Sequence, residues 1–199
     1  MRFLAGCVLL LISCGTPQPK DSIVVIVPKD TTTVVSPPVV VVDDTPIIPK
    51  GAVHANYISG EEEFYAYVKR VNSAKKTTVI GFQENTAPEI ILPESFGAEL
   101  SYLRFQEFDR DLLLINTVIL DPNFNKYYLY VLRDGQWKQV VNGWAIHKEN
   151  KPDTLSPIVV DPSNQNMMQR FYSVFDLDKD SELGYTWRLL SEAIDIKNR

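Results

Sequence analysis

Three carboxylates surround an arginine in the sequence EFDRD, where Glu107, Asp109 and Asp111 flank Arg110. Paired carboxylates are the usual acid and base of glycoside hydrolysis, so these three residues are the candidate catalytic groups of a glycan-acting enzyme. Nothing in the sequence places them in a cleft, and charged turns are common between strands. The alternative interpretation is therefore a solvated turn.

A second acidic run alternates with other residues in FDLDKDSEL and contains Asp176, Asp178, Asp180 and Glu182. Carboxylate oxygens at alternating positions are typical of the start of a calcium-binding loop. However, Ser181 stands where such a loop has its turn glycine, and Trp187 stands where it has its bidentate glutamate. The run is the only candidate metal site, and the sequence favours a solvated acidic turn with no metal.

Other chemistries lack their usual residues. The two histidines are His54 and His147, and the sequence contains no GxSxG, HExxH or glycine-rich phosphate-binding motif. A formal net charge of −5, without a cluster of lysines or arginines, disfavours binding to nucleic acid and to anionic lipid. We therefore expect no cofactor and no nucleic-acid partner, and an enzymatic role is less favoured than a binding role.

The amino terminus carries a targeting pattern. Arg2 precedes an apolar run over residues 3–12, and Leu11-Ile12-Ser13-Cys14 follows. This order is typical of a secretory signal peptide, and the run is shorter than the ~20 residues that span a bilayer. The four residues resemble the bacterial lipobox, which implies lipidation of Cys14 and removal of residues 1–13. The alternative is an ordinary secretory peptide with a chance cysteine.

Lipidation at Cys14 implies a stable membrane anchor, because each buried methylene of an acyl chain contributes ~0.8 kcal/mol. Removal of Cys7 with the signal peptide then leaves no thiol for a disulfide, a metal or catalysis. Gly15 is not the aspartate that favours retention at the inner membrane in many Gram-negative lipoproteins. The expected location is therefore the cell envelope at the outer membrane, and the general plan resembles lipoproteins of Bacteroidota.

The chain after Cys14 divides into a tether and one domain. Residues 14–50 contain seven of the 13 prolines, which predicts an extended tether. Its β-branched runs at residues 23–27 and 39–42 are either a stiff spacer or an added edge strand. Residues 51–199 have the length of a single globular domain, which we expect to be rich in β-structure.

One helix is expected in this domain. Ser59-Gly60-Glu61-Glu62 matches a capping box, and apolar residues follow at helical spacing from Phe64 to Val71. Strands are expected over residues 77–83, 89–92, 99–108, 171–177 and the first half of 185–196. The nearly continuous apolar residues 111–120 predict a central strand covered on both faces. The expected fold class is mainly β (α+β), an antiparallel sheet or sandwich-like domain with one packed N-terminal helix.

The best-specified region is a three-stranded meander over residues 127–133, 136–141 and 144–147. Asp134-Gly135 and Asn142-Gly143 are favoured two-residue hairpin turns. Strand alternation then places four aromatic residues on one face, which are Tyr128, Tyr130, Trp137 and Trp144. These rings are candidate ligand-binding residues for a glycan or a peptide. The alternative is that the face is buried core, because a three-stranded sheet needs one buried face.

These observations favour a lipid-anchored envelope protein whose domain has a non-catalytic binding or assembly role towards an envelope protein or a glycan. The first alternative is a hydrolase of peptidoglycan or another glycan that acts through Glu107, Asp109 or Asp111. The second alternative is an inhibitor of a wall hydrolase.

Overall fold

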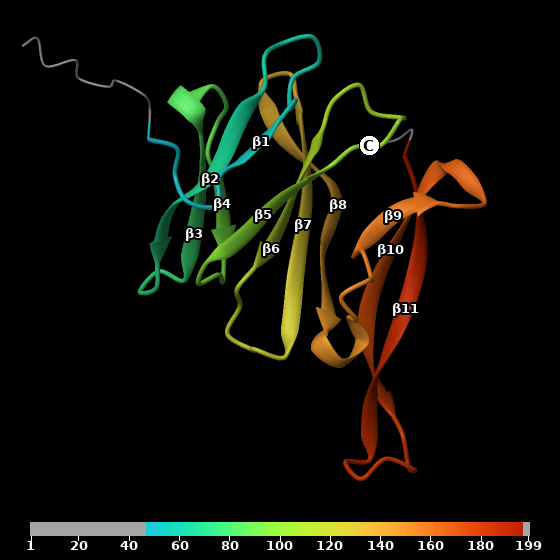
Figure 1. Ribbon diagram of the computed structural model, residues 1–199. Helices are drawn as coiled ribbons and strands as arrows, with labels where there is room; N and C mark the ends of the chain where they lie inside the picture. Colours follow the sequence, from blue (N-terminus) through green and yellow to red (C-terminus); the bar gives the residue numbers. More distant parts are fainter. Residues whose placement is uncertain (1–46, 197–199) are drawn as a thin grey trace, which may run out of the picture. The chain divides into compact units, whose positions relative to one another are not determined.

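The computed structural model describes residues 47–196, which form three antiparallel sheets (Figure 1). The first sheet contains β1 (Val53–Ala55), β2 (Phe64–Asn72), β3 (Thr77–Phe82) and β4 (Ile90–Pro93). The central sheet contains β5 (Ala98–Leu103), β6 (Leu112–Thr117), β7 (Phe124–Arg133) and β8 (Gln136–His147). The third sheet has the order β11-β10-β9, from β9 (Ile158–Asp161), β10 (Asn164–Leu177) and β11 (Tyr185–Asp195).

The mainly-β class is confirmed, since 57% of the described residues lie in strands. Their helical content is limited to two short 3₁₀ turns, η1 (Gln83–Asn85) and η2 (Lys148–Asn150). Cys14, the signal peptide and the tether as far as residue 46 lie outside the described residues, so these expectations stay predictions.

The central strands β6 and β7 are buried on both faces, because each of the other two sheets packs against one face of the central sheet (Figure 1). On β6, Leu113 and Ile115 belong to the core shared with the first sheet, whereas Leu112 and Leu114 belong to the core shared with the third. A strand buried on both faces is a continuous apolar run rather than an alternating one. The prediction of a doubly covered central strand is therefore confirmed.

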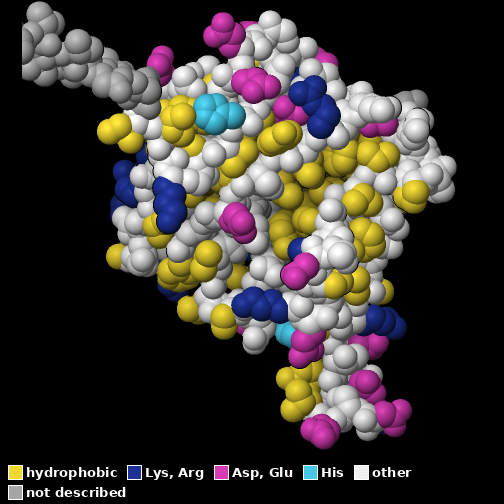
Figure 2. Space-filling view, in the orientation of Figure 1, with side chains coloured by type: hydrophobic (Ala, Val, Ile, Leu, Met, Phe, Trp, Pro, Cys, Tyr) yellow, Lys and Arg dark blue, Asp and Glu magenta, His cyan; other side chains and the backbone are white. Residues whose placement is uncertain are grey.

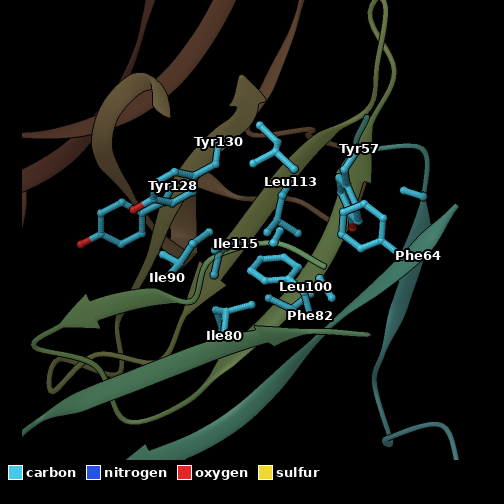
Figure 3. Packing of buried hydrophobic residues seen from close by; sticks show 14 of the residues in the cluster. Tyr57, Phe64, Ile80, Phe82, Ile90, Leu100, Leu113, Ile115, Tyr128 and Tyr130 are labelled. Atoms are coloured by element: carbon cyan, nitrogen blue, oxygen red, sulfur yellow. The ribbon is translucent and has the colours of Figure 1, made fainter. Parts of the chain in front are cut away.

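The core between the first and central sheets is rich in aromatic rings. Figure 3 shows Phe64 and Phe82 lying beside Tyr57 and Leu113 in this core. Some of its rings meet edge to face, as Tyr57 and Trp137 do at 5.6 Å between centroids, and others stack. The core between the central and third sheets includes Met168 of β10.

The prediction of a packed N-terminal helix after Ser59 is wrong. Ser59 and Gly60 lie in a loop, Gly60 has a φ of +76°, and the chain then enters β2. Phe64 and Ala66 are buried at alternate positions of β2, whereas Val71 of the expected helical stripe is exposed. Because β2 pairs with both β1 and β3, its backbone groups are satisfied in the sheet. Tertiary pairing thus overrides the helical spacing.

Of the two predicted hairpin turns, the first is confirmed and the second is wrong. Asp134 and Gly135 both have positive φ, 54° and 68°, and Arg133 pairs with Gln136. In contrast, β8 continues through Asn142-Gly143 and stays paired with β7 in an irregular register. Gly143 is required there for close approach, because a Cβ at this position would lie 2.7 Å from Cε1 of Tyr128.

β10 and β11 form the longest hairpin, which pairs from Met167↔Asp195 to Leu177↔Tyr185. The segment after Tyr185 is therefore a strand over almost its whole length. β9 accompanies β10 only as far as Arg170, so the distal part of the hairpin pairs with itself alone. The outer part of the hairpin, from the pair of Val174 and Arg188 to the turn, projects beyond the sheets (Figure 1). We call it the arm.

Candidate functional site

The structure does not bring the three EFDRD carboxylates together. Asp111 is buried, where its Oδ2 accepts hydrogen bonds from the Asn56 backbone N–H at 2.9 Å and from Arg104 Nη2 at 3.0 Å. Its carboxylate also forms an ion pair with Arg104. Asp111 therefore ties the loop after β5 to the loop after β1, which is a structural role.

Asp109 and Glu107 lie in a shallow hollow of about 460 Å³, which Asp111 does not line. Arg110 donates hydrogen bonds to both oxygens of Asp109, at 2.7 Å and 2.9 Å, and lowers the pKa of Asp109 to about 2. A carboxylate held ionised in this way is a poor proton donor or acceptor near neutral pH. The geometry therefore does not favour an acid–base pair at this place.

The four candidate ligand-binding rings lie in or against the two cores, which is the alternative of a buried face and not an open ligand-binding surface. Tyr128, Tyr130 and Trp137 lie in or against the core shared with the first sheet, and Trp137 stacks on Phe82 at 4.8 Å between ring centroids. Trp144 lies in the other core. This split arises because β8 continues through Asn142-Gly143 as one strand. Trp137 pairs with Leu132 and Trp144 with Tyr127, and these partners lie on opposite faces of β7.

The acidic run 176–182 lies along the arm and at its tip. Asp176 pairs with Arg188 at 3.1 Å, and Asp178 Oδ1 accepts the backbone N–H of Asp180 at 3.0 Å. Within residues 47–196, no group of three His, Cys, Asp or Glu side chains is placed to hold a metal ion. Glu182, the last residue of the run, borders a cavity described below.

One face of the arm is apolar and open to solvent. The cross-strand pairs Phe175↔Trp187 and Leu177↔Tyr185 place these four side chains on the same face. Phe175 is 54% exposed and Leu177 78%, and Leu183 at the turn is 72% exposed. Figure 2 shows hydrophobic side chains along one side of the arm and acidic side chains at its tip.

Beside this face lies a cavity of about 470 Å³, which we call the arm pocket. It extends from η2 and the start of β7 to the turn of the arm. Its rings come from His147, Tyr185 and Trp187, and its carboxylates from Glu149 and Glu182. Asn123 adds an amide, and no lysine or arginine is among the described residues that line this cavity.

The base of the arm pocket is a connected set of aromatic rings. The Trp187 ring meets Phe124 edge to face at 4.8 Å and stacks on His147 at 5.6 Å between centroids. Asn150 donates a hydrogen bond to the Trp187 carbonyl oxygen, and the His147 backbone N–H donates to Ser173 Oγ at 2.8 Å. These contacts hold the ring of Trp187 in place where the arm leaves the body of the domain.

His147 is 8% exposed, and its Nδ1 makes no hydrogen bond to another described residue. The nearest acidic atom to Nδ1 is Glu149 Oε2 at 3.7 Å. The arm pocket therefore combines rigid rings with two carboxylates. Ser181 also lines it, and its hydroxyl donates a hydrogen bond to the Tyr185 carbonyl oxygen at 2.7 Å. These groups can bind a ligand through stacking, hydrogen bonds and charge.

Sequence reasoning missed the arm pocket. It used Glu182 and Trp187 only as positions in a calcium-loop pattern, and His147 only as the end of a strand. An indication was present in the alternation of Phe175, Leu177, Tyr185 and Trp187, which predicts an apolar face on two successive strands. Alternation alone does not predict whether such a face is exposed to solvent or covered by another sheet.

Comparison of the chain with protein-family models, curated proteins and solved structures finds no match in any of the three. Among residues 47–196, no helix is long and apolar enough to cross a membrane.

Proposed function

We propose that this chain is a lipid-anchored protein of the bacterial cell envelope whose β domain is a non-catalytic binding module. The anchor is the lipidated Cys14, and the arm is the docking element for a partner protein. One observation carries the proposal, which is the exposed apolar face of the arm.

Exposed apolar side chains in a contiguous group mark interaction sites, whereas scattered ones need no explanation. Phe175, Leu177 and Tyr185 are contiguous across two paired strands, and Leu183 extends the group at the turn. An isolated two-stranded ribbon is only marginally stable in water. Docking against a partner would bury this face and stabilise the arm at the same time.

The charge of the arm favours one kind of occupant. Asp178, Asp180 and Glu182 make its tip acidic, with Lys179 among them. A second copy docked symmetrically would bring like charges together, and an anionic membrane surface would repel the tip. The occupant that complements the arm is a protein surface with an apolar groove bordered by lysine or arginine.

The test is a photo-reactive phenylalanine analogue placed at Leu177 in the full chain within the producing cells. We expect a crosslink to another protein of the envelope, and no such crosslink from the same analogue at Ile91, which is exposed on β4. The crosslinked protein, once purified, should bind the Leu177→Asp variant at least ~10-fold more weakly, because one buried anchor contributes more than 1 kcal/mol.

The control is Ile91→Asp, which should leave that affinity unchanged. Crosslinks only between copies of this chain, or equal affinities of the two variants, would contradict the proposal. Mass spectrometry of the mature amino terminus tests the anchor separately, since an unmodified terminus contradicts lipidation at Cys14.

A further inference from the structure

We infer that the arm pocket binds the side chain of a lysine or an arginine that the partner protein supplies. This inference deepens the proposed function and rests on it. It adds the chemical class of the ligand that the pocket takes, which the exposed apolar face does not specify.

The charge of the pocket gives the first argument. Several carboxylates elsewhere in the domain have a basic partner, as Glu89 has in Lys69 and Glu192 in Arg170. Glu149 and Glu182 line a cavity in which none of the described lining residues is a lysine or an arginine. The side chain of Glu149 is 80% exposed, and its Oε2 lies 3.7 Å from His147 Nδ1. Two carboxylates with no lysine or arginine beside them favour a positively charged ligand and disfavour phosphate or another anion.

The rings give the second argument. A cation is attracted to the face of an aromatic ring, most strongly to tryptophan. Trp187 contacts the rings of Phe124, Phe175 and His147, so its orientation does not depend on the ligand. Tyr185 provides a further ring on the same face of the arm, and Glu182 in the turn lines the same cavity.

The size and shape of the cavity give the third argument. A volume of about 470 Å³ is in the range of small-molecule pockets and exceeds the need of one lysine or arginine side chain. The pocket adjoins the exposed apolar face of the arm, so a docked chain segment can place one side chain in the pocket and apolar neighbours on Leu177 and Leu183. A neutral sugar could stack on the rings, but it would leave both carboxylates without compensation.

The experiment uses the full chain in detergent micelles, labelled with 5-fluorotryptophan. The chain has three tryptophans, so three fluorine signals are expected, and the Trp187→Phe variant identifies the one from the pocket. The probes are Nα-acetyl-lysine methylamide and Nα-acetyl-arginine methylamide. The matched neutral probe is Nα-acetyl-norleucine methylamide, which keeps the aliphatic chain and lacks the charge.

We expect both cationic probes to shift the Trp187 signal at millimolar concentration. The signals of the buried Trp144 and of the partly buried Trp137, which do not line the arm pocket, should stay in place. The double variant Glu149→Gln and Glu182→Gln should weaken the binding at least fivefold. The matched control Glu61→Gln and Glu62→Gln, in the exposed loop before β2, should not change it. Equal shifts with the norleucine probe, or with a neutral oligosaccharide alone, would overturn the inference.

Failure of this inference and failure of the proposed function have different signatures. If Leu177→Asp abolishes binding of the partner while the cationic probes leave Trp187 unchanged, only the pocket's ligand class is wrong. If Leu177→Asp leaves binding of the partner intact, the arm is not the docking element and the proposed function itself is wrong.

Discussion

The central sheet and the arm are both antiparallel β-structure with apolar side chains on their strands, but they differ in what covers those side chains. On β6 and β7 both faces are buried by the neighbouring sheets. On the arm, Phe175 and Leu177 face solvent, and the hairpin pairs only with itself. The same residue types therefore stabilise the fold in one region and are available to a partner in the other.

The largest expected difference between the two regions is in stability. Leu113→Ala should lower the free energy of unfolding by about 3 kcal/mol, because it removes a fully buried side chain and leaves a cavity. Leu177→Ala should lower it by less than about 0.5 kcal/mol, because its side chain is already in water. Urea unfolding followed by tryptophan fluorescence measures both values. Equal losses would mean that the arm is part of the cooperative core.

The second prediction compares two aspartates that each pair with an arginine. Asp111→Ala should cost about 2 kcal/mol, because it removes charge-assisted hydrogen bonds to a buried carboxylate and leaves the Asn56 N–H without its acceptor. Asp176→Ala removes the exposed pair with Arg188 and should cost less than about 0.5 kcal/mol. Urea unfolding of the two variants side by side is the measurement. A cost at Asp176 as large as that at Asp111 would contradict this view of the arm.

An element of this fold is predictable from the sequence when the residues that determine it are neighbours in the chain. The Asp134-Gly135 turn and the doubly covered β6 follow from adjacent residues, and both were predicted correctly. The helix was predicted wrongly because Phe64 and Val68 fit a helical spacing as well as the alternation of β2. The sequence around Asn142-Gly143 has a hairpin signal, but its glycine is used for close approach to Tyr128, which depends on a neighbouring strand.

The candidate site was harder to predict than the fold. His147 ends β8 while Trp187 lies near the start of β11, and only the pairing and packing of the third sheet bring their rings together. The aromatic residues of β7 and β8 had the stronger sequence pattern and proved to be core. Alternation identifies an apolar face, but the packing of other sheets decides whether that face stays open.

Gly143 and Gly184 provide a third comparison of the two regions. Gly143→Ala should lower the free energy of unfolding by about 1–2 kcal/mol, because the new Cβ would overlap the ring of Tyr128 within the core. Gly184 has a φ of +73° but no atom within 4 Å of an added Cβ, so Gly184→Ala strains the backbone by about 1 kcal/mol. That strain falls on the arm, where local opening does not require global unfolding.

Hydrogen exchange resolves the difference. We expect Gly143→Ala to reduce the protection of amides throughout β7 and β8, and Gly184→Ala to reduce it only near the turn of the arm. Loss of protection across the central sheet in the Gly184 variant would mean that the two regions unfold together.

The last comparison concerns the exposed charges at the end of the central sheet. Arg110 lowers the pKa of Asp109 to about 2. The stabilisation of the folded state by this pair is therefore fully present above the unfolded pKa of ~3.9, and it is lost as the pH falls through 2. Because the Asp109 side chain is 59% exposed, screening by solvent should limit the contribution to less than about 1 kcal/mol. Asp109→Asn should therefore lower stability slightly at pH 6 and not at pH 2, in urea titrations at both values. If Asp109→Asn lowered the free energy of unfolding more at pH 2 than at pH 6, the pairing with Arg110 would not be the source of the low pKa of Asp109. The expected result, a loss at pH 6 only, would make Asp109 an electrostatic contact that stabilises the fold and not a proton carrier.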